Sequence, residues 1–318
     1  CFIGSPKAVV SITPDTHVFN GETVYLRCDI QGGGDTQWTY SWNINNNEPY
    51  TYGWERVYRD RTRQEFSIRS VEDSDSGTYT CRGHKSDSQS SEISDAVTLT
   101  VSAERPKPTV RVNPQSSVYT GDTVTLSCEL QQGTGWKFQW YKNNQQLQNS
   151  AQENTLKVTE DNAGETEYKC RAVRRNYFKH YSDYYNGYYD TEFSDPVKIT
   201  VRERPRAVLS VSPQSWLTEG DSVTLSCEVT DSSTDWTFSW YTVVPYRDGL
   251  TGTNNNRGYS VYVEILSDSS RGSGGKYTLS PAALNHTGVY MCRGERGEPA
   301  LHTQYSHPQP LWITGEEN

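Results

Sequence analysis

The feature that most constrains this chain is a segment that occurs three times. It reads PKAVVSITPDTHVFNGETVYLRCDI at 6–30, PKPTVRVNPQSSVYTGDTVTLSCEL at 106–130 and PRAVLSVSPQSWLTEGDSVTLSCEV at 205–229. Each copy contains at least two prolines, alternating apolar residues, a glycine–acid turn and a cysteine. These cysteines stand at 28, 128 and 227, so the period is 100 and then 99 residues. A repeat of this length predicts three similar modules in series rather than one large core.

Each module continues with the same landmarks. A tryptophan follows the first cysteine, and a tyrosine stands two residues before a second cysteine in DSGTYTC (75–81), GETEYKC (164–170) and HTGVYMC (286–292). This order is typical of an immunoglobulin-type sandwich, in which a disulfide joins two sheets and the indole packs on it. The core tryptophans and the predicted disulfides are Trp42 with Cys28–Cys81, Trp140 with Cys128–Cys170, and Trp240 with Cys227–Cys292.

The fold class predicted from these landmarks is all-β. We expect three tandem immunoglobulin-like β-sandwich domains, each with one inter-sheet disulfide, at 1–104, 105–203 and 204–318. Disulfides of this kind indicate an oxidising, extracellular setting. Cys1 has no partner by this spacing. It is either left over from processing or bonded to another chain or to upstream sequence.

Composition and motifs exclude several kinds of function. The net charge of −9 argues against nucleic acid as a partner, and the basic run RAVRR (171–175) is interpreted as a solvated strand face. No catalytic, metal-binding or cofactor-binding motif is present, so we predict neither an enzyme nor a metal site nor a cofactor. The tripeptide NHT (285–287) is a glycosylation signal, which predicts a glycan on Asn285.

One segment of domain two departs from the repeat. The motif SDAVTLTV places Asp95 14 residues after Cys81, whereas SDPVKITV places Asp195 25 residues after Cys170. The FG hairpin of domain two has therefore gained about ten residues. The insertion lies in YFKHYSDYYNGYYDTEFSD (177–195), and Asn186-Gly187 at its centre predicts a type I′ turn. That turn would set Tyr184 and Tyr185 opposite Tyr188 and Tyr189.

The tyrosines of this hairpin favour binding to a protein. Tyrosine offers a large, stiff and amphipathic contact surface. Trp136 in the B–C turn is expected to be exposed at the same end of the sandwich. The alternatives are a strut between domains and a mobile surface loop. The predicted partner-binding residues are Trp136, Tyr177, Phe178, Lys179, His180, Tyr181, Tyr184, Tyr185, Tyr188 and Tyr189.

The chain also resembles a known receptor family. PKAVVSITP, DSGTYTCRG and SDAVTLTV in domain one are similar to segments of leukocyte Fc receptors and Fc-receptor-like proteins. In domain three, YTLSPAALNHTGVYMCRGERGEPALHTQYS resembles a repeat of the non-mammalian members. The resemblance implies an immune receptor of the plasma membrane, with its anchor beyond Asn318.

The same resemblance suggests a ligand. Family members that bind immunoglobulin Fc use loops of the second domain, which correspond here to Trp136 and 176–190. The long FG hairpin departs from the family pattern, so either Fc is bound in a modified way or the ligand is different. The second hypothesis is an adhesion ectodomain with a non-immunoglobulin or homophilic protein partner.

Overall fold

The chain is seen here in a computed structural model. It describes residues 4–32, 37–45, 57–58, 64–85, 89–148, 152–180, 183–231, 235–254, 260–267 and 271–315, and only the backbone of 57–58, 177–180, 183–186 and 273. The chain forms two compact units. The first contains residues 1–116, 123–158 and 165–199, and the second contains residues 117–122, 159–164 and 200–318. Domain one and most of domain two therefore belong to the first unit. Cys1 lies outside the described residues.

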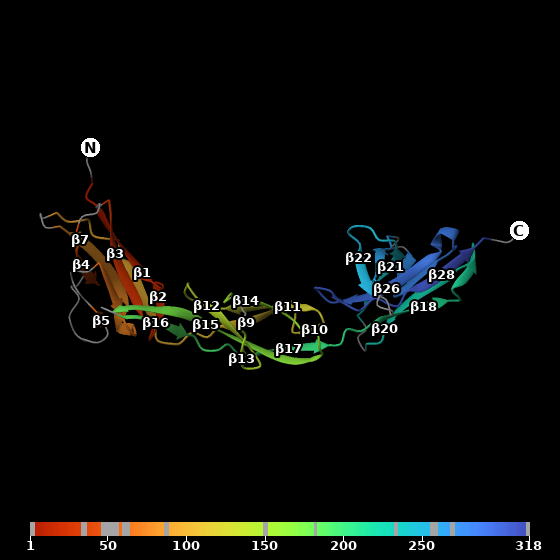
Figure 1. Ribbon diagram of the computed structural model, residues 1–318, viewed down its shortest axis with the longest axis horizontal. Helices are drawn as coiled ribbons and strands as arrows, with labels where there is room; N and C mark the ends of the chain where they lie inside the picture. Colours follow the sequence, from red (N-terminus) through yellow and green to blue (C-terminus); the bar gives the residue numbers. More distant parts are fainter. Residues whose placement is uncertain are drawn as a thin grey trace. The chain divides into compact units, whose positions relative to one another are not determined.

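Domain one is built from two sheets (Figure 1), whose strands pair antiparallel except for the parallel pair β2 and β8. Its elements are β1 (Lys7–Thr13), β2 (His17–Phe19), β3 (Val24–Gln31), β4 (Thr39–Ile44), β5 (Val57–Tyr58), β6 (Glu65–Ile68), η1 (Asp73–Asp75), β7 (Gly77–His84) and β8 (Val97–Ser102). One sheet has the order β1-β3-β6-β5 and the other β2-β8-β7-β4. Side chains alternate along β3, so that Val24, Leu26 and Cys28 are buried between the layers.

Domain two repeats this plan with one long strand. Its elements are β9 (Thr109–Asn113), β10 (Ser117–Tyr119), β11 (Thr123–Glu129), β12 (Lys137–Lys142), β13 (Gln145–Gln146), β14 (Thr155–Thr159), β15 (Gly164–His180), β16 (Asp183–Asp190) and β17 (Val197–Arg202). One sheet has the order β14-β11-β9. In the other, β12 lies between β13 and β15, and β16 pairs with β15 outside the main strand order. Within the second unit, β10 runs parallel to the end of β17.

Domain three has the largest sheets. Its elements are β18 (Ala207–Ser212), β19 (Trp216–Thr218), β20 (Val223–Val229), β21 (Thr237–Val244), β22 (Thr251–Asn254), β23 (Ser260–Ile265), β24 (Gly272–Ser273), β25 (Lys276–Leu279), η3 (Leu284–His286), β26 (Gly288–Arg296), β27 (Leu301–His302) and β28 (Gln309–Thr314). The two sheets have the orders β18-β20-β25-β24 and β19-β28-β26-β21-β23-β22, with β27 paired to β26.

The three predicted disulfides are confirmed. Cys28–Cys81, Cys128–Cys170 and Cys227–Cys292 each join one sheet of a domain to the other. In domain one, Trp42 belongs to the same buried cluster as Cys28 and Cys81, and its ring meets Phe66 edge-on with centroids 4.8 Å apart. The all-β fold of tandem immunoglobulin-type sandwiches is therefore correct. The domain boundaries at 1–104, 105–203 and 204–318 stay predictions.

The corner before the second cysteine is made in two chemical ways. In domain one the hydroxyl of Tyr79 donates to the carbonyl of Asp75 over 2.7 Å, and the Asp75 carboxylate accepts the N–H of Glu72 over 2.9 Å. In domain three the hydroxyl of Tyr290 donates to the carbonyl of His286 over 2.6 Å. There the ring Nδ1 of His286 accepts the N–H of Ala283 over 2.9 Å. An imidazole thus replaces a carboxylate as the acceptor that holds this turn.

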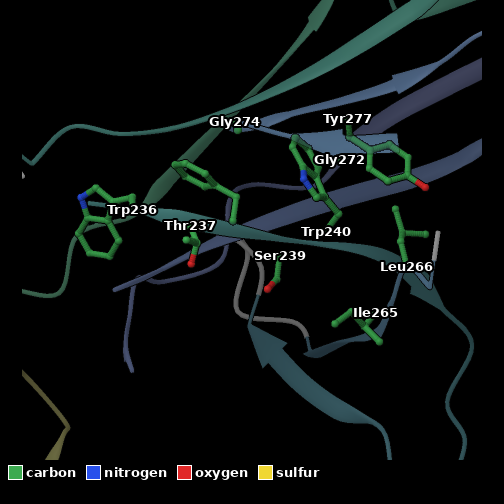
Figure 2. Close-up of a pocket in the computed structure, with 11 residues that line it drawn as sticks. Trp236, Thr237, Ser239, Trp240, Ile265, Leu266, Gly272, Gly274 and Tyr277 are labelled. Atoms are coloured by element: carbon green, nitrogen blue, oxygen red, sulfur yellow. The ribbon is translucent and has the colours of Figure 1, made fainter. Parts of the chain in front are cut away.

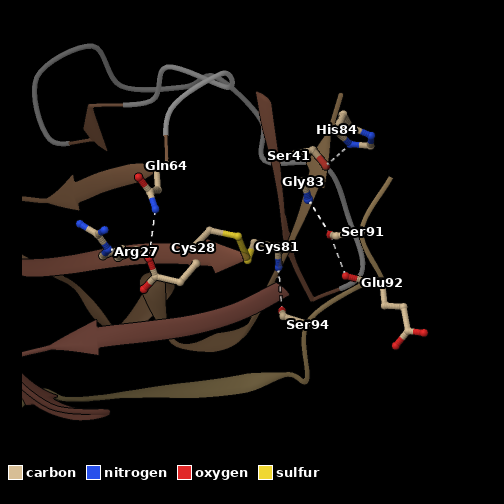
Figure 3. Close-up of a disulfide and its surroundings, with 11 residues drawn as sticks. Arg27, Cys28, Ser41, Gln64, Cys81, Gly83, His84, Ser91, Glu92 and Ser94 are labelled. Atoms are coloured by element: carbon tan, nitrogen blue, oxygen red, sulfur yellow. Dashed lines mark hydrogen bonds and ion pairs between the residues drawn. A yellow bond between two sulfur atoms is a disulfide. The ribbon is translucent and has the colours of Figure 1, made fainter. Parts of the chain in front are cut away.

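A hydroxyl clamp fixes where strand G begins in every domain. The N–H of each second cysteine donates to a serine hydroxyl: Cys81 to Ser94, Cys170 to Ser194, and Cys292 to Ser306, over 2.9 to 3.0 Å. Figure 3 shows the clamp of domain one beside its disulfide. The clamp spans 13 residues in domain one and 24 in domain two. The insertion in domain two therefore lengthens the FG hairpin and leaves the sandwich beneath it unchanged.

Two further findings concern membranes and modification. Among the described residues there is no helix with the length and apolar character that a bilayer crossing requires. Asn285 lies exposed in η3, and the hydroxyl of Thr287 in the same signal accepts the N–H of Ile313 over 2.9 Å. The glycan on Asn285 remains a prediction.

Candidate functional site

The inserted hairpin is a two-stranded ribbon that leaves the sandwich of domain two (Figure 1). Strand β15 pairs with β12 as far as Val173, and from Val173 onward it pairs with β16. The register joins Val173 to Asp190 at the base and His180 to Asp183 at the far end. Eight consecutive pairs hold the ribbon together, so the insertion is a regular extension of strand F and its return strand.

The predicted turn at Asn186-Gly187 is wrong. Asn186 lies opposite Tyr177 and Gly187 lies opposite Asn176, both within the strands. The chain reverses instead between His180 and Asp183. A turn at 186–187 would have left most of residues 174–180 without a ladder partner. The longer pairing satisfies more backbone groups and outweighs a local turn preference.

The two faces of the ribbon meet different surroundings. In β16, Tyr188 is 62% exposed, whereas its neighbour Tyr189 is 8% exposed. The Tyr189 ring lies beside Gly21 of domain one, because a Cβ placed on that glycine would be 3.9 Å from its Cε2. The guanidinium of Arg105 lies 5.7 Å from the Tyr189 ring. One face of the ribbon is thus packed at the junction of domains one and two, and on the opposite face the side chain of Tyr188 is exposed.

A buried ion pair crosses this junction. Nε of Arg174 in β15 donates to Oε1 of Glu22 over 2.9 Å, and Nη2 donates to Oε2 over 3.1 Å. Arg174 is 1% exposed and Glu22 is 0% exposed. The interpretation of residues 171–175 as a solvated strand face is therefore wrong at Arg174. Domain one covers that face of β15, and the acid beneath it supplies the opposite charge.

Neighbouring groups complete the hydrogen bonding of this pair. Oε2 of Glu22 accepts the N–H of Phe19 over 2.8 Å, and Nη1 of Arg174 donates to the carbonyl of Thr134 over 3.0 Å. Burial raises the pKa of Glu22 above its usual value, and the Arg174 charge acts in the opposite direction. Removal of Arg174 would leave the buried Glu22 charge without its partner, whereas removal of Glu22 would leave Arg174 with Asp15, whose Oδ2 lies 3.7 Å from Nη1.

A second polar contact lies beside the first. One carboxylate oxygen of Asp15 accepts the backbone N–H of Thr134 over 2.6 Å and its hydroxyl over 3.0 Å. Burial opposes ionisation of Asp15, but these hydrogen bonds outweigh it and lower the pKa of that carboxyl. In addition, the side-chain oxygen of Asn176 accepts the N–H of Thr23 over 3.1 Å. Domain one therefore contacts both the B–C turn and the ribbon of domain two.

Trp136 is half-buried in this junction rather than exposed beside the hairpin. The guanidinium carbon of Arg174 lies 3.9 Å from its ring centroid. Phe19 and Tyr189 lie 6.1 and 6.4 Å away, centroid to centroid, and the indole N–H donates to the carbonyl of Gln132 over 3.1 Å. For Trp136 and Tyr189 the structure favours the strut interpretation over contact with a partner.

The structure does not describe the side chains at the outer half of the ribbon. Tyr181 lies outside the described residues, and only the backbone is described for Tyr177, Phe178, Lys179, His180, Tyr184 and Tyr185. Those six residues lie in the paired part of β15 and β16. Among the predicted partner-binding residues, Tyr188 is therefore the one whose side chain is described and exposed.

The junction residues Glu22, Asp15 and Arg174 were not recognised from the sequence as a site. A signal was available in the repeats. Each domain has a tryptophan four residues before its core tryptophan and a cation four residues after its second cysteine. These pairs are Trp38 with Lys85, Trp136 with Arg174, and Trp236 with Arg296.

A separate pocket of about 390 Å³ lies in domain three (Figure 2). Trp236, Phe238, Trp240 and Tyr277 form much of its wall, and Gly272, Gly274 and Gly275 contribute no side chain to fill it. Its described lining contains no histidine, acid or cysteine. Across the described residues, no group of three or more His, Cys, Asp or Glu is placed to hold a metal ion. The pocket is an opening into the aromatic core.

Comparison with known sequences identifies the family. A family model described as "Immunoglobulin domain" matches residues 7–101 and 107–201. The chain belongs to the immunoglobulin domain family. A second model with the same description matches residues 204–295. The family assignment therefore extends to all three predicted domains.

The related proteins are receptors and a contactin. The chain is 27% identical to contactin-5 of Danio rerio over 294 residues, which is 90% of this chain and 24% of that protein. It is 28% identical to Fc receptor-like A of Rattus norvegicus over 196 residues, covering 60% of this chain and 48% of that protein. It is 23% identical to B-cell receptor CD22 of Mus musculus over 218 residues, covering 66% and 21%. This chain thus spans less than half the length of each relative.

A solved structure with a similar fold is the human OSCAR ligand-binding domain. It has a TM-score of 0.38 and 21% sequence identity, and the match covers 61% of this chain and 98% of that chain. Together with the sequence relatives, the domains place this chain among immunoglobulin proteins of the receptor and adhesion type.

Proposed function

We propose that this chain is the extracellular ligand-binding region of a cell-surface immune receptor. Its ligand is a protein, bound by the face of the β15–β16 ribbon that carries Tyr188. The observation that carries this proposal is the contrast between the two faces of β16, with Tyr189 buried at the junction and Tyr188 62% exposed. An aromatic residue on a rigid support is typical of protein-binding surfaces.

The junction supports this function by fixing the ribbon before a ligand arrives. Arg174 is bonded to Glu22, and Asn176 is bonded to the N–H of Thr23, both within the base of the ribbon. A ribbon held on one side loses little conformational freedom when the other side binds. The face that carries Tyr188 is therefore better suited to binding than an unsupported loop of the same composition.

Immunoglobulin Fc is the proposed ligand. The support is the resemblance of domains one and three to Fc-receptor-like proteins and the match to Fc receptor-like A over 60% of the chain. The ribbon lies in the domain that the resemblance implicates. Its length requires that Fc be bound in a modified way.

A binding assay against purified immunoglobulin classes tests both statements. We expect Tyr188→Ala to weaken binding by about tenfold or more, because interface tyrosines are frequent hot spots. Tyr246→Ala is the matched control, since Tyr246 is 64% exposed but lies in domain three. If no class binds the unmodified chain, Fc is the wrong ligand. If the two variants bind equally well, the ribbon is the wrong surface.

The second candidate function is adhesion. It is favoured by contactin-5, whose match covers 90% of this chain. An adhesive, homophilic role predicts that the purified chain associates with itself and that Tyr188→Ala reduces the association. Sedimentation equilibrium of the two proteins distinguishes this role from binding to a different ligand.

A further inference from the structure

The repeated tryptophan–cation pairs adopt the same arrangement in all three domains. Nζ of Lys85 lies 4.5 Å from the ring centroid of Trp38. The guanidinium carbon of Arg174 lies 3.9 Å from Trp136, and that of Arg296 lies 5.1 Å from Trp236. We call each tryptophan with its cation a receiving pair, because in two of the three domains the pair contacts an aromatic residue of a preceding domain.

In domains two and three the receiving pair contacts an aromatic residue from a preceding domain. Phe19 lies 6.1 Å from Trp136. Within the second unit, Nη2 of Arg296 donates to the hydroxyl of Tyr119 over 3.0 Å. Phe19 and Tyr119 stand at the same place in the repeat, nine residues before the first cysteine of their domains. In both cases, therefore, the same turn of one domain contacts the tryptophan–cation pair of the next domain along the chain.

An acid accompanies each aromatic residue. Glu22 and Asp122 follow three residues after Phe19 and Tyr119, and each accepts the N–H of that aromatic residue. Glu22 also pairs with the cation of its receiving pair, Arg174. We call the aromatic residue with its acid the aromatic turn. In both cases the ring contacts the receiving pair, while the acids differ: Glu22 binds the cation of the pair, and Asp122 binds the neighbouring Arg204.

The described residues include no domain before domain one, so they supply no aromatic turn for its receiving pair. Trp38 and Lys85 are both half-buried, and the described chain before them consists of β1 to β3 of the same domain. We propose that Trp38 and Lys85 form a docking surface for the aromatic turn of a further immunoglobulin domain. This surface continues the pattern of the junction between domains one and two, and Lys85 supplies the charge that an acidic turn requires.

The chemistry of the occupant follows from the two examples. It carries a phenylalanine or tyrosine nine residues before its first core cysteine and an acid three residues after that aromatic residue. The turn of domain three has Thr218 and Asp221, so it carries the acid and lacks the ring. A second copy of this chain therefore does not supply the occupant through domain three, and we assign the surface to a different immunoglobulin domain.

The missing ring also provides the test. Thr218 and Asp221 are exposed, so Thr218→Phe completes an aromatic turn in domain three. We expect the full chain with Thr218→Phe to associate head to tail, with a dissociation constant at least tenfold lower than that of the unmodified chain. A buried aromatic ring readily accounts for a tenfold change. Sedimentation equilibrium over a range of concentrations measures it.

Two second-site changes show whether the new ring binds where we propose. Lys85→Glu and Trp38→Ala, each combined with Thr218→Phe, should return the dissociation constant to that of the unmodified chain. Trp38 also packs against Gly83, so Lys85→Glu is the variant that leaves the core of domain one intact. Thr98→Phe is the control, because Thr98 is an exposed strand threonine outside both turns.

Each outcome decides the proposal. Association that depends on Thr218→Phe and is lost with Lys85→Glu supports it. The proposal is wrong if Thr218→Phe associates no more strongly than the unmodified chain or than Thr98→Phe. It is also wrong if Thr218→Phe associates equally strongly when it is combined with Lys85→Glu. None of these measurements involves immunoglobulin binding, so they are independent of the proposed function.

Discussion

The sharpest prediction concerns the charge on Glu22. Glutamine has nearly the same shape, and its side-chain oxygen can still accept the N–H of Phe19. Glu22→Gln therefore removes the charge while preserving the packing. Arg174, at 1% exposure, then loses its nearest counter-ion and keeps the more distant Asp15, whose Oδ2 lies 3.7 Å from Nη1. Loss of one partner from a buried pair costs about 3–5 kcal/mol.

This cost cannot exceed the free energy that holds domains one and two together. When domains one and two separate, Arg174 returns to water and the penalty disappears. Each sandwich also keeps its own disulfide, Cys28–Cys81 or Cys128–Cys170. We therefore expect Glu22→Gln to open the junction and leave both domains folded.

Hydrogen exchange of a junction amide measures the opening. The N–H of Thr23 donates to the side chain of Asn176 across the junction over 3.1 Å. A loss of 3 kcal/mol would speed its exchange by roughly a hundredfold, since 1.36 kcal/mol corresponds to a factor of ten. Amides in the middle of β3 and β11 should exchange at unchanged rates.

The matched control is an ion pair in the same sheet that faces water. Nη1 of Arg171 lies 3.0 Å from Oδ2 of Asp190, and the two side chains are 25% and 34% exposed. Asp190→Asn should cost roughly 0–1 kcal/mol. Equal exchange at Thr23 in Glu22→Gln and Asp190→Asn would refute the conclusion that the buried pair holds the junction.

Three other predictions address stability and modification. Burial lowers the pKa of His286 below its usual value, so the unfolded chain takes up this proton first. The contribution of His286 to the stability of the folded chain is therefore complete above pH 6.5 and falls as the pH drops below that value. His286→Asp should remove this part of the pH dependence of stability, measured by thermal melts between pH 8 and 5. Replacing Cys128 and Cys170 by alanine should cost domain two about 2–5 kcal/mol in urea unfolding. Expression through a secretory pathway should add a glycan mass that both an N-glycosidase and Asn285→Gln remove.

The sandwich could be predicted from the sequence because its determinants are local and repeated. The landmark residues Cys28, Trp42, Tyr79 and Cys81 define opposite sheets and the corner that connects them, and the same set occurs three times. Even the length of the FG insertion followed from alignment of Asp95 with Asp195. These features depend on strand periodicity and cysteine spacing, which a single sequence displays directly.

The junction could not be predicted by the same means. Arg174 is a charged residue in a run of charged residues, and its burial depends on Glu22, which lies 152 residues away in another domain. Trp136 was expected to be exposed because the B–C turn of an isolated sandwich faces water. Such errors arise when one domain covers the end of another. Only the repetition of tryptophan and cation at fixed offsets indicated that these ends share a role.

The prediction of the hairpin turn was wrong for a different reason. Asn186-Gly187 has a strong local preference, but strand register is decided by all the pairs along a ribbon together. A shift of one residue in β16 would exchange its faces, turning Tyr188 toward domain one and Tyr189 toward water. Arg174 is opposite Tyr189 in the register, and its bond to Glu22 fixes which face of the ribbon meets domain one. The buried ion pair therefore also determines which tyrosine is free, so the junction and the proposed ligand surface are two consequences of one strand register.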